Sequence, residues 1–228
     1  MGDEQKRIDA VFKGRAGLEE KYAIGNAGNA FNLRMLTGQL KAFLDRLRTP
    51  LESLKLLDTG AGQLFWPELF IQFGLKRKHC FGTDLLHWRL AKGHADGRDV
   101  SAVTADAATM PFADNQFDIV TQFTLLTSVL DPEIKKNIAS EMMRVLKPGG
   151  HILWYDFRYD NPANENTKAI GKAEIVKLFR PLKAEFQTIT LLPPLARKIP
   201  RSMSPILTML YLFPILRSHY LAIIGPKG

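Results

Sequence analysis

The sequence predicts an α/β fold in which helices cover a parallel sheet on both faces. Short apolar runs typical of strands alternate along the chain with stretches whose apolar residues recur at helical spacing. The first three strand-like runs each end in an aspartate, at Asp58, Asp84 and Asp106. The first two are 84 − 58 = 26 residues apart, enough for a helix and a return strand. With 228 residues, 46% of them hydrophobic, we expect one compact domain with a full core.

The predicted elements follow one another in chain order. Strands are predicted near residues 54–58, 79–83, 101–105, 117–123, 151–157, 185–191 and 219–224. The clearest helix extends from Pro132 to Leu146, because Pro132 suits a first turn and four apolar residues recur at helical spacing. These four residues are Ile134, Ile138, Met142 and Val145. A further helix is predicted near residues 172–179.

Two additions frame the sheet, whose core is expected over residues 54–192 and 218–226. Residues 5–48 are predicted to form a cap of two helices around the turn Gly25–Asn29. Residues 193–217 lie between the last two strands, where a short hairpin would suffice. The apolar part of this insertion is far shorter than the ~20 residues needed to cross a bilayer. Additions at the carboxyl ends of parallel strands usually carry function, so we expect a lid-like insertion.

The first strand runs into a glycine-rich turn, Asp58-Thr59-Gly60-Ala61-Gly62. Because glycine has no Cβ, it permits a sharp turn and lets a ligand lie against bare backbone. The dinucleotide-binding fingerprint needs a third small residue three positions after the second glycine, where this chain has Phe65. The Gly-Lys-Ser/Thr ending of a P-loop is also missing from the turn. An adenosine ligand without a pyrophosphate therefore suits the turn better than a dinucleotide.

Two more aspartates follow predicted strands. Asp84 ends the second strand, where a carboxylate can accept hydrogen bonds from both hydroxyls of a ribose. The alternative is that Asp84 caps a helix that starts near Leu85. Asp106 ends the third strand and is followed by Ala107 and then by Met110-Pro111-Phe112.

Taken in order, these segments resemble the class I S-adenosylmethionine-dependent methyltransferases, in particular the group that acts on small molecules, lipids and sugars. The matching segments are Asp58–Gly62, Asp84, Asp106–Ala107, Met110–Phe112, Phe117–Asp118 and Arg144–Gly150. The family usually carries a third glycine where this chain has Leu64, which bears on the local shape of the turn. The resemblance implies a single methyltransferase domain over residues 1–228. It also implies a Rossmann-like sheet of seven strands, mostly parallel, with the last strand antiparallel.

The resemblance further implies S-adenosyl-L-methionine as the cofactor. The residues implied to bind it are Asp58, Thr59, Gly60, Ala61 and Gly62 at the methionine end, Asp84 and Leu85 at the ribose, Asp106 and Ala107 at the adenine, and Gln122 and Phe123 beside the sulfonium. Tyr22, Asn26 and Arg34 are further candidates for the amino-acid carboxylate, with helix caps and surface positions as the alternative. No metal site is expected, because the five histidines are scattered and no His/Cys cluster has ligand spacing.

Methyl transfer from a sulfonium is an in-line displacement at carbon, so the protein mainly has to align the acceptor and exclude water. Tyr155, Asp156 and Arg158 follow the fifth strand, where the acceptor should rest. Asp156 is a candidate base for a hydroxyl proton, and Arg158 is a candidate clamp for an acidic group. Alternatively, Asp156 and Arg158 form an ion pair that closes the strand end. His219, at the start of the last strand, is a second candidate base.

These observations predict a methyltransferase that acts on a small-molecule, sugar or lipid-linked acceptor, at oxygen. One alternative is an RNA or other nucleic-acid methyltransferase, suggested by the net charge of +8. Against it, the fourth strand ends in Thr121–Thr124 and not in the Asn/Asp-Pro-Pro-aromatic segment used for exocyclic amines of bases. The other alternative is a catalytically silent partner protein that binds the cofactor without turnover.

The composition also bears on the cellular location and on the kind of binding partner. The single cysteine, Cys80, excludes a disulfide framework, and the polar start Met1–Lys6 carries no visible secretion signal, so a cytoplasmic protein is expected. The basic charge favours anionic partners. The insertion, with Arg197, Lys198 and Arg201 at its near end, is expected to cover the acceptor pocket and to permit a peripheral membrane contact. The alternative is a helix that packs on the sheet or on a second subunit.

Overall fold

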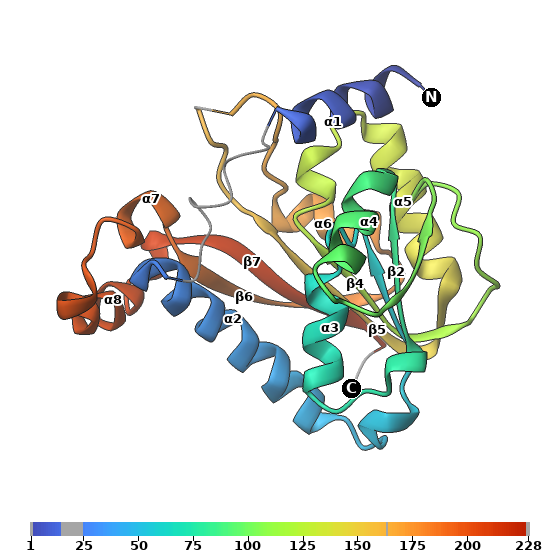
Figure 1. The fold of residues 1–228 in the computed structure, drawn as a ribbon, viewed down its shortest axis with the longest axis horizontal. Helices are drawn as coiled ribbons and strands as arrows, with labels where there is room; N and C mark the ends of the chain where they lie inside the picture. The colour runs from blue at the N-terminus through green and yellow to red at the C-terminus, as the bar shows by residue number, and fades with distance from the viewer. Residues whose placement is uncertain (1, 15–24, 163, 227–228) are drawn as a thin grey trace.

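The computed structural model describes residues 2–14, 25–162 and 164–226, and its centre is a seven-stranded sheet (Figure 1). The strands follow the order β3-β2-β1-β4-β5-β7-β6 across the sheet. Their bounds are β1 Leu56–Thr59, β2 Cys80–Asp84, β3 Ser101–Thr104, β4 Phe117–Phe123, β5 Leu146–Phe157, β6 Lys183–Leu191 and β7 Arg217–Gly225. Strands β1 to β5 are parallel, and β7 pairs antiparallel with both β5 and β6. The expected mostly parallel sheet with an antiparallel last strand is confirmed.

Helices flank this sheet along the described part of the chain. The α-helices are α1 Asp3–Lys13, α2 Ala27–Arg46, α3 Phe65–Gln72, α4 His87–Ala95, α5 Pro132–Val145, α6 Lys172–Leu178, α7 Pro193–Ala196 and α8 Ser204–Tyr211. The short 3-10 helices are η2 Leu51–Ser53, η3 Arg77–His79, η4 Leu126–Ser128, η5 Arg201–Met203 and η6 Pro214–Leu216. Among the residues that the structure describes, no helix is long and apolar enough to cross a membrane.

The sheet has a hydrophobic layer on each face. Because side chains alternate across a strand, neighbouring residues enter opposite layers. Leu56 and Leu153 are fully buried with residues of α2 and α3, on what we call the α2 face. Leu57 and Trp154 are fully buried with residues of α5 and α6, on the α5 face. This alternation decides which side chains at the strand ends can reach the site described below.

Strand β5 begins earlier than the sequence predicts. We expected a turn over residues 146–150 and a strand from His151, whereas β5 already begins at Leu146. The pairing with β4 shifts its register between Phe117 and Ile119, and Gly149 has a φ of +83°. An irregularity of this kind lets the strand continue through a Pro-Gly-Gly segment that reads as a turn in the sequence.

Leu64 takes the backbone conformation that a glycine would favour. Its φ is +64°, in the left-handed region, and it forms the N-cap of α3. This conformation costs a non-glycine residue roughly 1–2 kcal/mol. The fully buried Leu64 side chain packs with Ala61, Leu90 and Val100, and burial of a leucine contributes about 1.5–3 kcal/mol. Burial of the Leu64 side chain thus offsets the cost of the left-handed backbone, so the turn forms without the glycine that the family usually has there.

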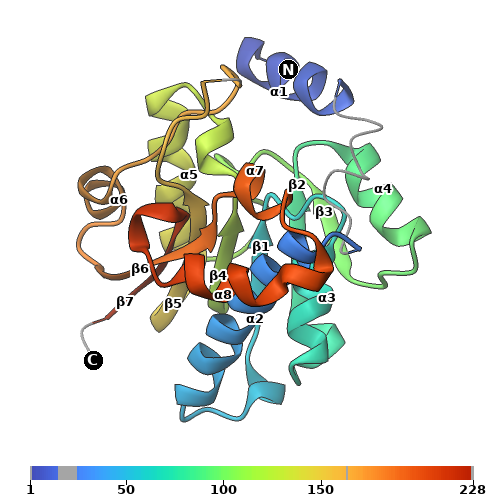
Figure 2. The same cartoon turned by 90° about the vertical axis from the view of Figure 1, so that its left-hand side faces the viewer.

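The insertion after β6 packs tightly on the start of α2, as Figures 1 and 2 show. A Cβ added to Gly28 would lie 2.3 Å from the backbone carbonyl of Ala196 in α7, so a larger residue at position 28 would push the two helices apart. The buried Asn32 side chain exchanges two hydrogen bonds with the backbone of Leu191, at 2.8 and 2.9 Å. Helix α2 therefore fixes the place where the insertion leaves β6.

Candidate active site

A cavity of about 1080 Å³ lies at the carboxyl ends of the parallel strands. Eight of the residues predicted to form the site line it: Gly60, Asp84, Leu85, Asp106, Ala107, Phe123, Tyr155 and His219. Small-molecule sites usually measure about 300–1000 Å³, so this cavity is large enough for a cofactor and a second small ligand together.

The glycine turn leaves bare backbone at one wall of the cavity. Gly60 lines the cavity with a φ of +75°, and a Cβ at this position would lie 3.0 Å from the Leu125 side chain. A Cβ on Gly62 would lie 2.4 Å from the guanidinium of Arg89. Thr59, Ala61 and Gly62 are buried behind this wall and do not line the cavity. Glycine is thus needed at both positions of the turn, and at Gly60 the bare backbone allows a ligand in the cavity to approach closely.

Asp84 holds the glycine turn and the start of α4 together. Its Oδ2 accepts hydrogen bonds from the backbone N–H of Gly62 at 2.8 Å and from Nη1 of Arg89 at 3.1 Å. Its Oδ1 accepts from the backbone N–H of Leu86, the N-cap residue of α4, at 2.9 Å. The residue also lines the cavity. Asp84 therefore orders the helix start and also presents a carboxylate to the cavity.

Asp106, which follows β3, also lines the cavity. Its Oδ1 accepts from the backbone N–H of Ala108 at 2.8 Å, which holds the carboxylate in place. Its Oδ2 accepts from the side-chain amide of Gln5 in α1 at 2.6 Å. This oxygen thus already bonds an amino group of the kind that an adenine ring carries, so the carboxylate can serve as an acceptor for a nucleobase amine.

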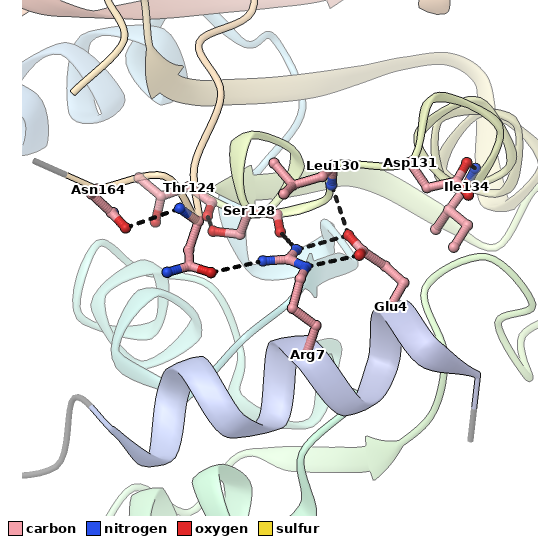
Figure 3. Close-up of polar contacts among 9 residues, drawn as sticks. Glu4, Arg7, Thr124, Ser128, Leu130, Asp131, Ile134 and Asn164 are labelled. Carbon is pink, nitrogen blue, oxygen red and sulfur yellow. Dashed lines mark hydrogen bonds and ion pairs between the residues drawn. The ribbon is translucent and has the colours of Figure 1, made fainter. Parts of the chain in front are cut away.

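Helix α1 closes one side of the cavity through a charged network, which Figure 3 shows. Arg7 donates to both carboxylate oxygens of Glu4 at 2.8 Å and to the carbonyl of Ser128 at 2.6 Å. Glu4 also accepts from the backbone N–H of Leu130 at 2.7 Å, and Arg7 reaches Oδ1 of Asn166 at 3.4 Å. The hydrogen bond from Arg7 lowers the pKa of Glu4. The helix is thereby attached to the loop between β4 and α5.

Aromatic side chains on the α2 face form the other end of the cavity. Phe123 stacks on Trp66 with 4.2 Å between ring centroids, and Tyr155 stacks on His219 at 4.6 Å. Phe157 lies 4.1 Å from the His219 ring. All five residues line the cavity. This end offers flat, mostly apolar walls.

His219 is an uncharged hydrogen-bonding group in this aromatic wall. Burial lowers its pKa to about 3, so the imidazole is neutral at pH 7. Its Nδ1 lies 2.8 Å from Oγ of Ser218. The Tyr155 hydroxyl is likewise engaged, 2.8 Å from Oγ1 of Thr190, and burial raises the pKa of this phenol. Nε2 of His219 can therefore form a hydrogen bond with a ligand, because the bond to Ser218 uses only Nδ1.

Asp156 does not face the acceptor, contrary to the sequence-based expectation. It is fully buried, and the alternation along β5 turns its side chain away from Tyr155 and toward the α5 face. Its carboxylate accepts from the backbone N–H of Thr127 at 3.0 Å, from the Thr127 hydroxyl, and from the backbone N–H of Phe157 at 3.0 Å. Burial raises its pKa to about 6. Asp156 holds η4 through Thr127 and does not line the cavity.

Arg158 is also displaced from its predicted role. Its Nη1 donates to the carbonyl of Pro214 at 3.2 Å, and its guanidinium lies over the rings of Tyr159 and Tyr220. It does not line the cavity and forms no ion pair with Asp156. The side chain instead supports the end of the insertion.

Two predicted cofactor residues lie just behind the cavity wall. Gln122, on the α5 face, is fully buried, and its Oε1 accepts from the backbone N–H of Leu125 at 3.0 Å. Asp58 accepts from the Thr121 hydroxyl at 2.6 Å, while its Oδ2 is buried without a hydrogen-bond partner. Burial raises the pKa of Asp58 to about 7. Both residues shape the strand ends and do not line the cavity.

The three candidates from the N-terminal helices are not brought to the site. Asn26 caps α2 by accepting from the backbone N–H groups of Gly28 and Asn29, and it donates to the carbonyl of Arg197. Arg34 is exposed, with its guanidinium near the Phe31 ring. Tyr22 lies outside the described residues. The alternative roles of cap and surface residue hold for the first two.

Several lining residues were not predicted from the sequence. They come from α1, α2 and α4, and include Gln5, Phe12, Asn32, Trp88 and Arg89. Trp88 and Arg89 could have been predicted from the sequence, because a helix that begins after Asp84 places its first turn beside the same strand end. The lining residues of α1 could not, because their position depends on tertiary packing alone. Within the described ranges, no group of three or more His, Cys, Asp or Glu side chains could hold a metal.

Comparison with known proteins identifies the domain. A family model described as "Methyltransferase domain" matches residues 57–154. A curated relative from Roseobacter denitrificans, named ubiquinone/menaquinone biosynthesis C-methyltransferase UbiE, is 31% identical over 172 residues, which cover 71% of this chain and 64% of the relative. The chain thus spans less than two thirds of the length of the first curated relatives that it matches.

Solved structures share the fold at low sequence identity. A putative methyltransferase, solved in complex with the Haloferax volcanii Trm112 methyltransferase activator, has a TM-score of 0.63 and 19% identity, covering 100% of this chain and 99% of that one. Haemonchus contortus phosphoethanolamine N-methyltransferase 2, solved with S-adenosyl-L-methionine, has a TM-score of 0.59 and 18% identity, covering 83% of this chain and 53% of that one.

Proposed function

Because the chain belongs to the class I S-adenosylmethionine-dependent methyltransferases, we propose that it is an active enzyme that methylates a small hydroxylated aromatic acceptor at a ring carbon. S-Adenosylmethionine is the cofactor of this family, and it supplies a methyl group on a sulfonium, already activated for transfer. The observation that carries the proposal is the single cavity wall running from Asp84 and Asp106 to the aromatic end at Tyr155 and His219.

The carboxylate end of the cavity suits the adenosine part of the cofactor. The carboxylate of Asp84 would accept from the ribose hydroxyls, and Asp106 would accept from the adenine amine, while Gly60 leaves room for close approach. Leu85 and Ala107, which follow the two aspartates, also line the cavity and would contact the nucleoside. Helix α1 would then exclude water from this end.

The aromatic end suits a flat, mostly apolar acceptor. Phe123 and Tyr155 would flank its ring, and Pro193 and Arg197 of the insertion add part of the wall. His219 would accept a hydrogen bond from an acceptor hydroxyl, because its lowered pKa lets it accept a hydrogen bond but not keep a proton. This hydrogen bond polarises the O–H bond and raises the electron density on the oxygen. The oxygen donates that density into the ring, so the ring carbon beside the hydroxyl becomes more nucleophilic.

Carbon is proposed here in place of the oxygen expected from the sequence. The Roseobacter relative is named a C-methyltransferase of quinone biosynthesis, and a base able to keep an acceptor proton is missing from the aromatic end as described. In the transfer, the new carbon–methyl bond forms as the carbon–sulfur bond breaks, and the ring then loses a proton to solvent. The name of the relative serves only as a guide to the class of acceptor.

The test is the chemical structure of the product. The protein is incubated with S-adenosylmethionine labelled in its methyl group and with a reduced naphthoquinone that lacks the ring methyl group. We expect the label on a ring carbon in the NMR spectrum of the product. A labelled methoxy group would contradict transfer to carbon. Cofactor binding without transfer to this or other hydroxylated aromatics would leave the chain a silent partner protein.

His219→Asn should lower kcat/KM at least about tenfold, because the hydrogen bond to the acceptor hydroxyl is lost. The cofactor dissociation constant should stay unchanged, since His219 lies at the acceptor end. His79→Asn is the matched control, because His79 precedes β2 at the opposite edge of the sheet. Equal turnover in both variants would remove His219 from the proposal.

Asp106→Ala should weaken S-adenosylmethionine binding by about tenfold to a hundredfold, the value of one lost hydrogen bond to a charged group. Titration calorimetry measures the dissociation constant, and circular dichroism checks the fold. Asp114→Ala, at an exposed position, is the control. An unchanged dissociation constant for Asp106→Ala would mean that the adenine does not use this carboxylate.

A further inference from the structure

The segment from Met203 to Ile215 exposes an unusual amount of apolar surface. Seven large hydrophobic side chains are exposed in the part of the chain that the structure describes, and five of them lie in this segment. The five are Met203, Met209, Leu212, Phe213 and Ile215, each between 49% and 70% exposed. A concentration of apolar side chains on one surface marks a place that contacts another apolar phase or partner.

Helix α8 is apolar on both its inner and its outer side. On the inner side, Leu207 is 1% exposed and packs with Phe31 of α2 and Ala196 of α7. On the outer side, Met209 is exposed on α8 itself, and Leu212 and Phe213 are exposed directly after the last residue of the helix. Apolar side chains exposed together at one end of a helix are suited to being covered by an apolar phase or partner.

The charge around this surface has one sign. No aspartate or glutamate occurs between residues 186 and 228, whereas Lys198 and Arg201 are exposed immediately before α8. Exposed apolar side chains with exposed cations in the same segment match an anionic lipid surface, where headgroups attract the cations and the acyl boundary accepts the apolar side chains. A protein partner or a second copy would not need acidic residues to be missing from 43 consecutive positions (228 − 186 + 1).

We infer that α8 and η6, with Lys198 and Arg201, form a docking surface for an anionic lipid membrane. The segment lies in the interface and does not span it, since α8 has only 8 residues. Figure 2 shows α8 in front of the end of the molecule that also carries α7. Pro193 and Arg197 of the same insertion line the cavity, so the docked surface would hold the cavity beside the membrane. The inference does not depend on the acceptor.

The test is flotation of the full chain with lipid vesicles. One set is made of phosphatidylcholine, and the other contains about 30% phosphatidylglycerol. We expect the wild type to float with the anionic vesicles, and to be released from them at about 0.5 M NaCl. Leu212→Ser/Phe213→Ser should lower the partition coefficient at least about tenfold, since two exposed apolar side chains that would enter the membrane interface are lost. Lys198→Glu/Arg201→Glu should abolish the preference for phosphatidylglycerol.

Val176→Ser is the matched control, because Val176 is an exposed apolar residue of α6, outside the insertion. It should float like the wild type. The fold of each variant is checked by its thermal unfolding and by cofactor binding. Equal flotation with both vesicle types would contradict the anionic preference. A dimer in light scattering that Leu212→Ser/Phe213→Ser dissociates, with no flotation of the wild type, would show that a second copy covers this surface and would overturn the inference.

Discussion

Asp84→Ala is expected to weaken binding of S-adenosylmethionine at least about a hundredfold. The carboxylate makes three hydrogen bonds within the protein besides those proposed to the ribose. It fixes the backbone of Gly62 and Leu86, and it holds the guanidinium of Arg89. Its loss would therefore remove the proposed ribose contacts and also release the glycine turn against which the cofactor is proposed to lie. Titration calorimetry with the cofactor measures the change in dissociation constant.

The control for this variant is Asp99→Ala, which removes an exposed carboxylate from the segment between α4 and β3. Asp99→Ala should bind the cofactor like the wild type. Urea unfolding of both variants separates a local effect from loss of the fold. If folded Asp84→Ala binds the cofactor within about threefold of the wild type, the ribose does not depend on this carboxylate.

Asp58 should make the stability of the protein fall as pH rises through neutrality. Burial raises its pKa in the folded state to about 7, from an ordinary value of 3.8. The folded state therefore binds a proton that the unfolded state has already released. The stabilisation from the neutral carboxyl is fully present below about pH 4 and is lost as the pH passes the folded-state value.

Asp58→Asn removes this titration, because an amide keeps no ionisable proton. The difference in unfolding free energy between Asp58→Asn and the wild type should change in favour of the variant by about 2–4 kcal/mol between about pH 4 and pH 8. Urea unfolding, followed by tryptophan fluorescence, measures it. Asp45→Asn is the control, because Asp45 is largely exposed. A difference for Asp58→Asn that is constant with pH would mean that Asp58 is charged in the folded protein.

The sheet was accessible from the sequence because its signals are local. The runs that end at Asp58, Asp84 and Asp106 each combine an apolar strand with a turn, and parallel strands bring such ends to one edge. The same logic predicted Tyr155 near the acceptor, and Tyr155 lines the cavity, as does His219 near the start of the antiparallel strand β7. The antiparallel last strand was predicted from the family resemblance, and its position between β5 and β6 was not predicted, because such pairing leaves no local mark in the sequence.

Asp156 and Gln122 lie outside the cavity lining because of the direction of their side chains. Asp156 and Gln122 each stand next to a residue that lines the cavity, Tyr155 and Phe123, and alternation along the strand turns them to the other face. Which of two neighbouring residues faces the cavity depends on how the strand pairs with its neighbours. The sequence did not show this pairing for β5, which begins at Leu146 and not at His151. The role of Gln5 was out of reach, because a contact between residues 5 and 106 depends on how α1 packs.

The central claim is that the cavity binds S-adenosylmethionine as the methyl donor and not a nicotinamide dinucleotide. Titration calorimetry of the unmodified protein, first with S-adenosylmethionine and then with NAD⁺, tests it most directly. We predict saturable binding of one S-adenosylmethionine per chain and no heat of binding with NAD⁺, because Gly60 and Gly62 are followed by the buried Leu64 and by Phe65 where a dinucleotide fold needs a small residue. Tight binding of NAD⁺ with no response to S-adenosylmethionine would contradict the account.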